Sequence, residues 1–220
     1  MEESRRFLRL VMPGFVFGLE VILCLFIVFP DWTTTQLSAL TGKDGLGVIL
    51  GSIFASGALG YIFATVHHFC HWSIDEDILN HVPLIERLIQ KGLIPKEAEV
   101  DREKALIVSM ALWYERAGEG RSIDIVADKK LVSLGDITHG LGTARIASVF
   151  AFVTVLGFCV DLGTIHCEWE SVIRTILMLL ITIGMIVLFW NGYSRAGRLA
   201  QGIYDTILES ALTEERIAKK

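Results

Sequence analysis

Residues 8–30 read LRLVMPGFVFGLEVILCLFIVFP, an apolar run that holds only two charged side chains, Arg9 and Glu20. Helical residues advance about 1.5 Å each, so this run extends about 35 Å and is long enough to cross the hydrocarbon core of a bilayer, which is about 30 Å thick. The run exceeds the apolar core of a secretory signal peptide, and no small-x-small cleavage pattern follows it. We therefore predict a transmembrane helix here.

Three further apolar runs of similar length follow along the chain. The whole sequence of 220 residues is 52% hydrophobic and 20% charged, with a mean hydropathy of +0.53, whereas soluble domains are about 45–50% apolar and about 25% charged. This pattern predicts an all-α integral membrane protein with four transmembrane helices, and it excludes a secreted disulfide scaffold, a disordered chain and an ordinary cytosolic enzyme. The further spans are expected at residues 46–67, 146–165 and 172–190.

Basic residues alternate strictly between the segments that connect the spans. The N-terminal segment, counted to Arg9 at the edge of the first span, has three, the middle connection has ten and the tail has five, whereas the other two connections hold only Lys43. Because Lys and Arg accumulate on the cytoplasmic side, we expect both termini in the cytoplasm, and the short loops favour a prokaryotic inner membrane. The net charge of −5 gives no reason to expect a nucleic-acid partner. The basic-rich segments are residues 1–9, 70–145 and 191–220; the poor ones are 31–45 and 161–171.

The middle connection and the tail predict a small helical cytoplasmic layer. Asn80 is a candidate cap for a helix over residues 81–91, Gly92 ends it, and Asp101 is a candidate cap for a second helix over 102–117. The tail predicts a helix that continues the fourth span. The expected organisation is an N-terminal segment with the first transmembrane hairpin (1–68), a helical cytoplasmic region (69–145), a second hairpin (146–190) and a C-terminal helix (191–220).

Glu20 is the most unusual residue within the predicted spans. It lies about 18 Å along the first span from Leu8, close to the middle of the bilayer. A carboxylate at this depth costs about 2.5–3.5 kcal/mol on insertion scales, so it should face the bundle interior or a wet cavity. Such a group points to an ion or proton path, or to an interhelical hydrogen bond that holds the bundle together. We expect an intramembrane polar layer of Glu20, Ser56, Thr154 and Thr182.

The second span is rich in small residues, which let two helices approach closely. Gly47 and Gly51 form a GxxxG pattern that Ala55 extends. This face is expected to pack against the first span of the same chain or against another copy in a homo-oligomer. The predicted packing residues are Gly47, Gly51, Ala55, Gly57 and Gly60.

The stretch HHFCHW, residues 67–72, ends the second span with ligand-type side chains. His67, His68, Cys70 and His71 fall within about one helical turn, a spacing at which His and Cys bind zinc, iron or copper. The HHxxH pattern resembles the histidine boxes of membrane di-iron desaturases and hydroxylases, whose several boxes need more histidines than the six of this chain. A transition metal at His67 and His71 is one reading; histidines that bind lipid phosphate or sense pH are the other. No cofactor is otherwise expected.

Two cytoplasmic features complete the candidate sites. Asp136 and His139 lie in LGDITHGLG, where Gly140 and Gly142 predict a tight turn into the third span, and this segment is expected to dock near the His67–His71 region. Asp136 and His139 could pair across one helical turn, and the alternative is that the segment only caps the N-terminus of the third span. The second predicted cytoplasmic helix is too apolar to lie free in water. The candidate gate or partner surface is Leu112 and Trp113 of this helix together with Asp136 and His139. Arg145 and Arg174, near the starts of spans, are expected to extend to the lipid headgroups.

No nucleotide-binding, nucleophile-elbow or P-loop motif occurs in the sequence, so we do not expect an enzyme. The favoured function is an oligomeric channel or membrane-permeabilising protein gated through its cytoplasmic helices. The alternative is a membrane adaptor that docks a soluble partner, for example as an accessory component of a prokaryotic defence system, an association by architecture alone. A third hypothesis is a metal-dependent membrane enzyme centred on the histidine cluster.

Overall fold

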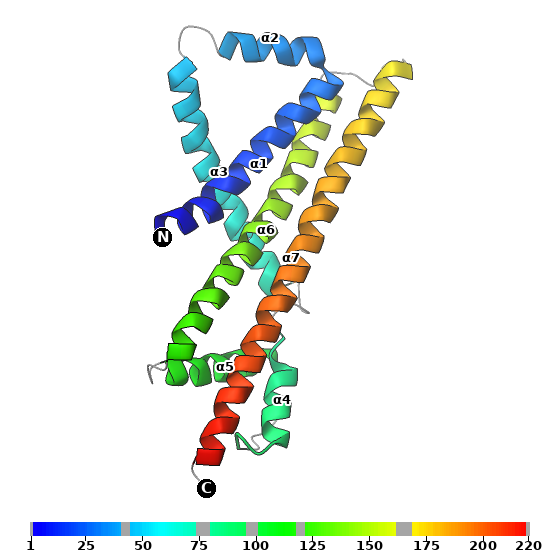
Figure 1. Cartoon of the computed structure of the whole chain (residues 1–220). Coiled ribbons are helices and arrows are strands. Elements are labelled where there is room, and N and C mark those ends of the chain that lie inside the picture. Colours follow the sequence, from blue (N-terminus) through cyan, green and yellow to red (C-terminus); the bar gives the residue numbers. More distant parts are fainter. Residues whose placement is uncertain are drawn as a thin grey trace. The chain divides into compact units, whose positions relative to one another are not determined.

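A computed structural model of the chain describes residues 2–40, 45–73, 80–95, 101–117, 122–161 and 169–218. Within these ranges the regular structure is entirely α-helical, without a strand (Figure 1), which confirms the predicted all-α class. The helices are α1 (Glu2–Val28), α2 (Pro30–Leu40), α3 (Gly45–Ser73), α4 (Val82–Gln90), α5 (Arg102–Ala117), α6 (Ser122–Asp161) and α7 (Trp169–Ala218).

Four of these helices are long and apolar enough to cross a membrane, as predicted. The apolar segment of α7 is 45 residues long, about 68 Å, and only part of that length fits within the hydrocarbon core. The predicted continuation of the fourth span into the tail is therefore confirmed as a single helix. The four segments are Arg9–Val28, Gly51–Cys70, Leu131–Cys159 and Trp169–Thr213.

Two predicted connections are helical instead. Residues 30–40 form α2, which begins at Pro30 and carries Asp31 in its first turn, both favourable at a helix start. The predicted turn at Gly140 and Gly142 is wrong, because α6 runs without interruption through both glycines. An isolated glycine weakens a helix by only about 1 kcal/mol, so packing can keep it helical.

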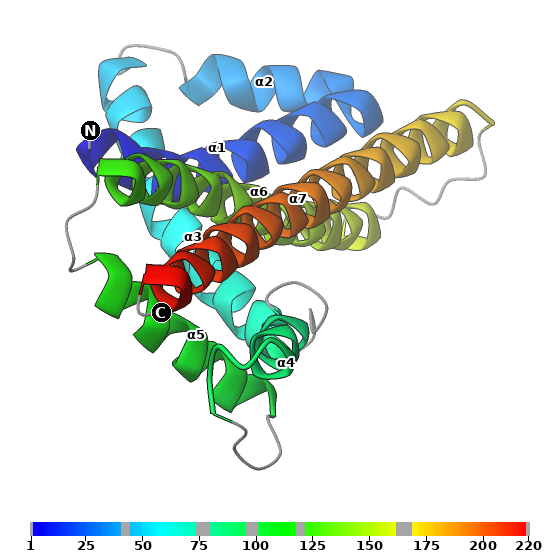
Figure 2. The same ribbon diagram turned by 60° about the horizontal axis from the view of Figure 1, so that its bottom comes forward.

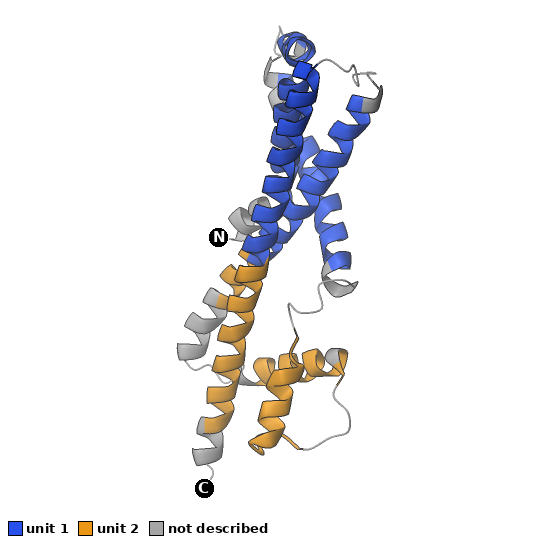
Figure 3. Ribbon diagram, turned by 90° about the vertical axis from the view of Figure 1, so that its right-hand side faces the viewer, with its two compact units in different colours: residues 1–70, 138–193 blue, residues 71–137, 194–220 orange. Residues whose placement is uncertain are grey.

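The chain divides into two compact units, coloured in Figure 3. Unit 1 comprises residues 1–70 and 138–193, and unit 2 comprises residues 71–137 and 194–220, so α6 and α7 contribute to both. In unit 1, one apolar cluster joins α1, α6 and α7, and another joins α3 and α6. The buried residues of the first are Cys24, Val28, Val155 and Met178; those of the second are Phe63, Ile146 and Ala147.

Unit 1 also exposes large apolar side chains along its candidate spans. Leu19 on α1, Phe54 on α3 and Leu180 on α7 are 66%, 77% and 64% exposed. A unit surrounded by water would leave these groups hydrated, whereas acyl chains solvate them in a bilayer. The outward faces of these helices are thus compatible with a membrane environment.

Unit 2 contains α4, α5, residues 122–137 of α6 and the part of α7 that follows Tyr193, and its apolar core is formed by α4, α5 and α7 (Figure 2). Leu84, Leu88 and Ala105 are completely buried at its centre. The N-cap of α4 is His81 rather than Asn80, although Asn80 Oδ1 accepts a hydrogen bond from the Val82 amide. Gly92, which has a positive φ of 64°, follows the end of α4 as predicted. The amide of Lys104 donates to Asp101 Oδ1, and this hydrogen bond lowers the pKa of the Asp101 carboxyl.

Candidate functional site

Glu20 lies inside unit 1, where α1 meets α6. Its side chain is buried, and the Ser148 hydroxyl donates a hydrogen bond of 2.6 Å to Glu20 Oε1. Glu20 Oε2 is also buried but accepts no hydrogen bond from any residue that the structure describes. A buried carboxyl oxygen without a donor is energetically costly, so this position is a candidate for function as well as for packing.

The other members of the predicted polar layer lie at different places in unit 1. Thr182 is buried, and its Oγ1 lies 3.5 Å from Cys24 Sγ. Cys24 follows Glu20 by one helical turn on α1. Ser56 is buried and its backbone lies against Gly14, about 9 Å along α1 from Glu20. Thr154 is only half-buried, and its hydroxyl donates to the carbonyl of its own helix at Phe150. The structure therefore brings Thr182 close to the Glu20 region and leaves Thr154 outside it.

Sequence reasoning missed Ser148, the hydrogen-bond partner of Glu20. The third span was expected to begin at residue 146. Ser148 would then lie near the start of that span and not near the middle of the bilayer. Because α6 begins at Ser122 and its apolar segment at Leu131, Ser148 lies well inside the helix. A search for serine or threonine along a longer third span would have found it.

The small residues of α3 make one close helix contact. A side chain at Gly60 would overlap the backbone of α1 at Leu10, and one at Gly14 would overlap the backbone of α3 at Ser56. Gly47, Gly51 and Gly57 have open space where a side chain would be, and Ala55 is exposed. Within the described chain, the contact between α1 and α3 therefore uses Gly14 and Gly60 instead of the GxxxG face.

The histidines at the end of α3 meet residues of α6 and α7. The ring of His67 is almost fully buried, and its centroid lies 5.7 Å from that of His139 and 5.3 Å from that of Tyr193, both edge-on. A side chain at Gly142 would overlap the His67 ring, so this glycine makes room for the imidazole. His68 is exposed.

The predicted metal cluster is only partly described. Cys70 is half-buried, and the side chain of His71 lies outside the described residues. Among the side chains that the structure describes, no three His, Cys, Asp or Glu residues lie close enough to hold a metal ion. A transition metal at His67 and His71 stays a prediction that metal analysis of the purified protein can test.

Arg145 differs most from its sequence-based expectation. It was expected to extend to the headgroups, yet it is buried, with its guanidinium carbon 4.4 Å from the Trp190 ring centroid and 4.9 Å from that of Tyr193. Such contacts are cation–π interactions, which are stronger when desolvated. The aromatic rings of α7 thus stabilise a cation inside unit 1. Arg174 instead pairs with Glu170 one turn away, at 2.6 Å.

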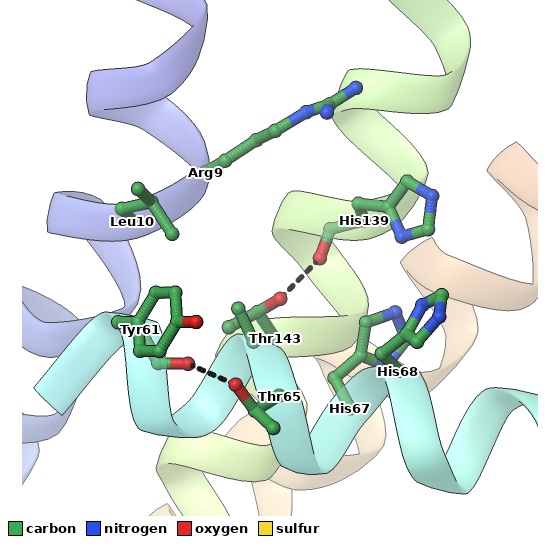
Figure 4. A pocket seen from close by; sticks show the side chains of 9 residues that line it. Arg9, Leu10, Tyr61, Thr65, His67, His68, His139 and Thr143 are labelled. Atoms are coloured by element: carbon green, nitrogen blue, oxygen red, sulfur yellow. Dashed lines mark hydrogen bonds between the residues drawn. The ribbon is translucent and has the colours of Figure 1, made fainter.

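A pocket of about 460 Å³ opens beside His67 (Figure 4). Side chains from α1, α3 and α6 line it, and all of them belong to unit 1. The charged or titratable members are Arg9, His67, His68 and His139. This combination of arginine and imidazole groups favours anionic ligands.

The predicted partner surface on α5 is turned inward. Leu112 packs on the core of unit 2, and Trp113 stacks on Tyr204 with ring centroids 4.9 Å apart. Val108 of α5 is 37% exposed, and three further apolar side chains, Ile107, Met110 and Tyr114, are 58%, 43% and 67% exposed. The spacing of these three residues puts them on one helix face, so this face replaces Leu112 and Trp113 as the candidate docking surface. Asp136 is half-buried on α6.

Comparison with known proteins gives no family for this chain. No family model matches it, and neither does any curated protein or solved structure. Its function is therefore inferred from the chemistry of its own side chains, of which Glu20 and the His67 region carry the most information.

Proposed function

We propose that several copies of this chain form a membrane channel or a membrane-permeabilising assembly, gated through the helices of unit 2. The observation that carries this proposal is Glu20, a carboxyl buried in a candidate span with one oxygen that accepts no hydrogen bond from a described residue. Ionisable residues within transmembrane segments are rare because their burial is costly, and they mark ion pathways and proton relays.

Conduction requires more than one copy. Met178 and Val155 are completely buried and fill the centre of unit 1 between α1, α6 and α7, so a path has to form between chains. In the packed form the Glu20 carboxyl lies against Ser148 on α6. Separation of α1 from α6 would open this contact and expose the carboxyl to a water-filled path.

Ion flux from liposomes that contain the purified protein tests this function. We expect flux from the wild type, and a decrease of at least about tenfold in Glu20→Ala, equivalent to about 1.4 kcal/mol of lost stabilisation of the conducting form. Thr154→Ala is the control, because the Thr154 hydroxyl donates to the Phe150 carbonyl of its own helix and, among the described residues, is not hydrogen-bonded to another helix. Equal flux from Glu20→Ala and Thr154→Ala would assign Glu20 to packing alone, and no flux from folded wild type would contradict the proposed function.

We also propose that both termini and unit 2 lie in the cytoplasm of a prokaryotic cell. The support is the alternation of basic segments, with ten basic residues at 70–145 and one at 31–45. Reporter fusions should therefore show a cytoplasmic signal after residue 220 and a signal on the opposite side within residues 41–44. A C-terminal fusion that reports the outside would overturn this orientation.

A membrane adaptor is the second candidate function. It is favoured by the exposed face of Ile107, Met110 and Tyr114 on α5, since apolar side chains that recur on one side of an exposed helix are typical of a helix that binds another protein. In this case the spans anchor unit 2, and a soluble protein covers α5.

A further inference from the structure

The pocket beside His67 is the strongest candidate for a ligand site in unit 1. Its volume of about 460 Å³ lies within the range of small-molecule sites, roughly 300–1,000 Å³. Three helices supply its walls, so its shape depends on tertiary packing rather than on one surface loop. Figure 4 shows Arg9 reaching from α1 toward the α6 wall, where His139 lies, while His67 and His68 come from α3.

The lining chemistry selects an anion. Among the described residues that line the pocket none is acidic, whereas one is arginine and three are histidine. Arginine keeps its charge at all physiological pH values and presents a planar fork of N–H donors, and every imidazole offers at least one N–H or, when protonated, two. An oxyanion matches this donor set better than a neutral or cationic ligand does.

The two threonine hydroxyls of the pocket are hydrogen-bonded within their own helices. Thr65 donates its proton to the Tyr61 carbonyl at 3.0 Å, and Thr143 donates to the His139 carbonyl at 2.7 Å. Because both protons are used within the helices, the threonines supply little donor capacity to a ligand. The other polar groups of the lining are the nitrogen atoms of Arg9 and of the three histidines and the hydroxyl of Tyr61.

The position of the pocket along the spans indicates the kind of anion. Arg9 is the first residue of the apolar segment of α1, and His67 and His68 lie in the last turn of the apolar segment of α3, which ends at Cys70. The ends of transmembrane segments lie at the depth of the lipid headgroups. Phosphate groups are the most concentrated anions at that depth, and arginine binds them in a bidentate manner.

We propose that this pocket binds the phosphate group of an anionic ligand, supplied either by a phospholipid headgroup or by a soluble phosphate compound. Arg9 and His68, both exposed, contact the phosphate first, and His139 completes the donor set from α6. His67 forms the buried wall of the pocket. Its ring packs edge-on against Tyr193, and Gly142 makes room for it because a larger residue there would overlap the imidazole. This site is separate from Glu20 and does not depend on the proposed conduction.

Binding by the purified full-length protein tests the proposal, with three probes titrated in detergent. The probes are a short-chain phosphatidylglycerol, a diacylglycerol with the same chains but no phosphate, and inorganic phosphate. The variant is Arg9→Gln, and the matched control is Arg174→Gln, which removes an arginine that pairs with Glu170 on α7 and does not line the pocket. His68→Gln is a second variant on an exposed side chain.

We expect Arg9→Gln to weaken phosphate-dependent binding by about tenfold or more, His68→Gln to weaken it less, and Arg174→Gln to leave it unchanged. Tighter binding of phosphatidylglycerol than of inorganic phosphate supports a lipid headgroup, and equal binding of the two supports a soluble phosphate. Phosphatidylglycerol that binds no better than diacylglycerol, with no binding of inorganic phosphate, overturns the proposal. An equal loss in Arg9→Gln and Arg174→Gln overturns it as well.

Discussion

Gly60→Ala is expected to destabilise unit 1 by about 1–3 kcal/mol, whereas Gly57→Ala is expected to leave its stability unchanged or raise it by up to about 1 kcal/mol. Both changes add one methyl group to α3 and both improve helix propensity. They differ in what the methyl group meets. At Gly60 it overlaps the backbone of α1 at Leu10, whereas at Gly57 it enters open space. Since backbone cannot rotate away as a side chain can, α1 and α3 must separate in Gly60→Ala.

The midpoint of unfolding in mixed detergent micelles measures this difference. Gly57→Ala controls for propensity and for the added apolar surface, so the comparison isolates the contact between α1 and α3. A Gly60→Ala protein as stable as Gly57→Ala would show that α1 and α3 do not approach each other at this residue. A strong loss in Gly57→Ala alone would instead assign the close contact to the other side of α3.

Trp113→Asp is expected to destabilise unit 2 by about 2–4 kcal/mol, while Tyr114→Asp leaves its fold intact. Trp113 stacks on Tyr204, whose hydroxyl donates a 2.7 Å hydrogen bond to the Ser109 carbonyl, so this aromatic pair links α5 to α7. An aspartate at position 113 removes the stacking and puts a carboxylate beside an aromatic ring. Tyr114 is the adjacent residue but points away from the core and is 67% exposed.

Limited proteolysis of the purified protein separates the two variants, because an unfolded unit 2 is cleaved at many sites. If Trp113→Asp is cleaved faster than the wild type and Tyr114→Asp is cleaved at the wild-type rate, the result agrees with the structure. The reverse result contradicts it.

The Tyr114→Asp protein also tests the adaptor function. If cross-linking in cells captures a soluble protein on wild type and loses it in this folded variant, the exposed face of α5 is a docking surface.

The membrane spans were predictable because they depend on length and hydropathy alone. In hydrocarbon, a spanning segment must make its backbone hydrogen bonds within itself, so it is a helix. A helix that crosses the bilayer needs about 20 apolar residues, and a run of that length is visible in the sequence. The start of the third span was less predictable. Because glycine has a low helix propensity, Gly140 and Gly142 predict an interruption of the helix, yet α6 runs through both. The absence of a side chain at Gly142 makes room for His67 of α3. A tertiary contact overrides the local preference there.

The partners of buried polar residues were not predictable from one sequence. The depth of a residue in the bilayer follows from counting residues along its span, and this count placed Glu20 near the middle of the bilayer. Which helix faces Glu20 depends on the rotation of each helix about its axis, and this is set by packing contacts such as those at Gly14 and Gly60. For the same reason Arg145 was expected at the headgroups, whereas two aromatic rings of α7 hold it inside the unit.

Conductance of the purified protein in a planar lipid bilayer tests the proposed channel function most directly, with wild type compared with Glu20→Gln. Glutamine keeps the size of the side chain and still accepts a hydrogen bond from Ser148, but it never ionises. We predict discrete current steps for the wild type, and steps that are smaller or at least about tenfold rarer for Glu20→Gln. The absence of steps from folded wild type, or identical steps from both proteins, would contradict a conducting role for Glu20.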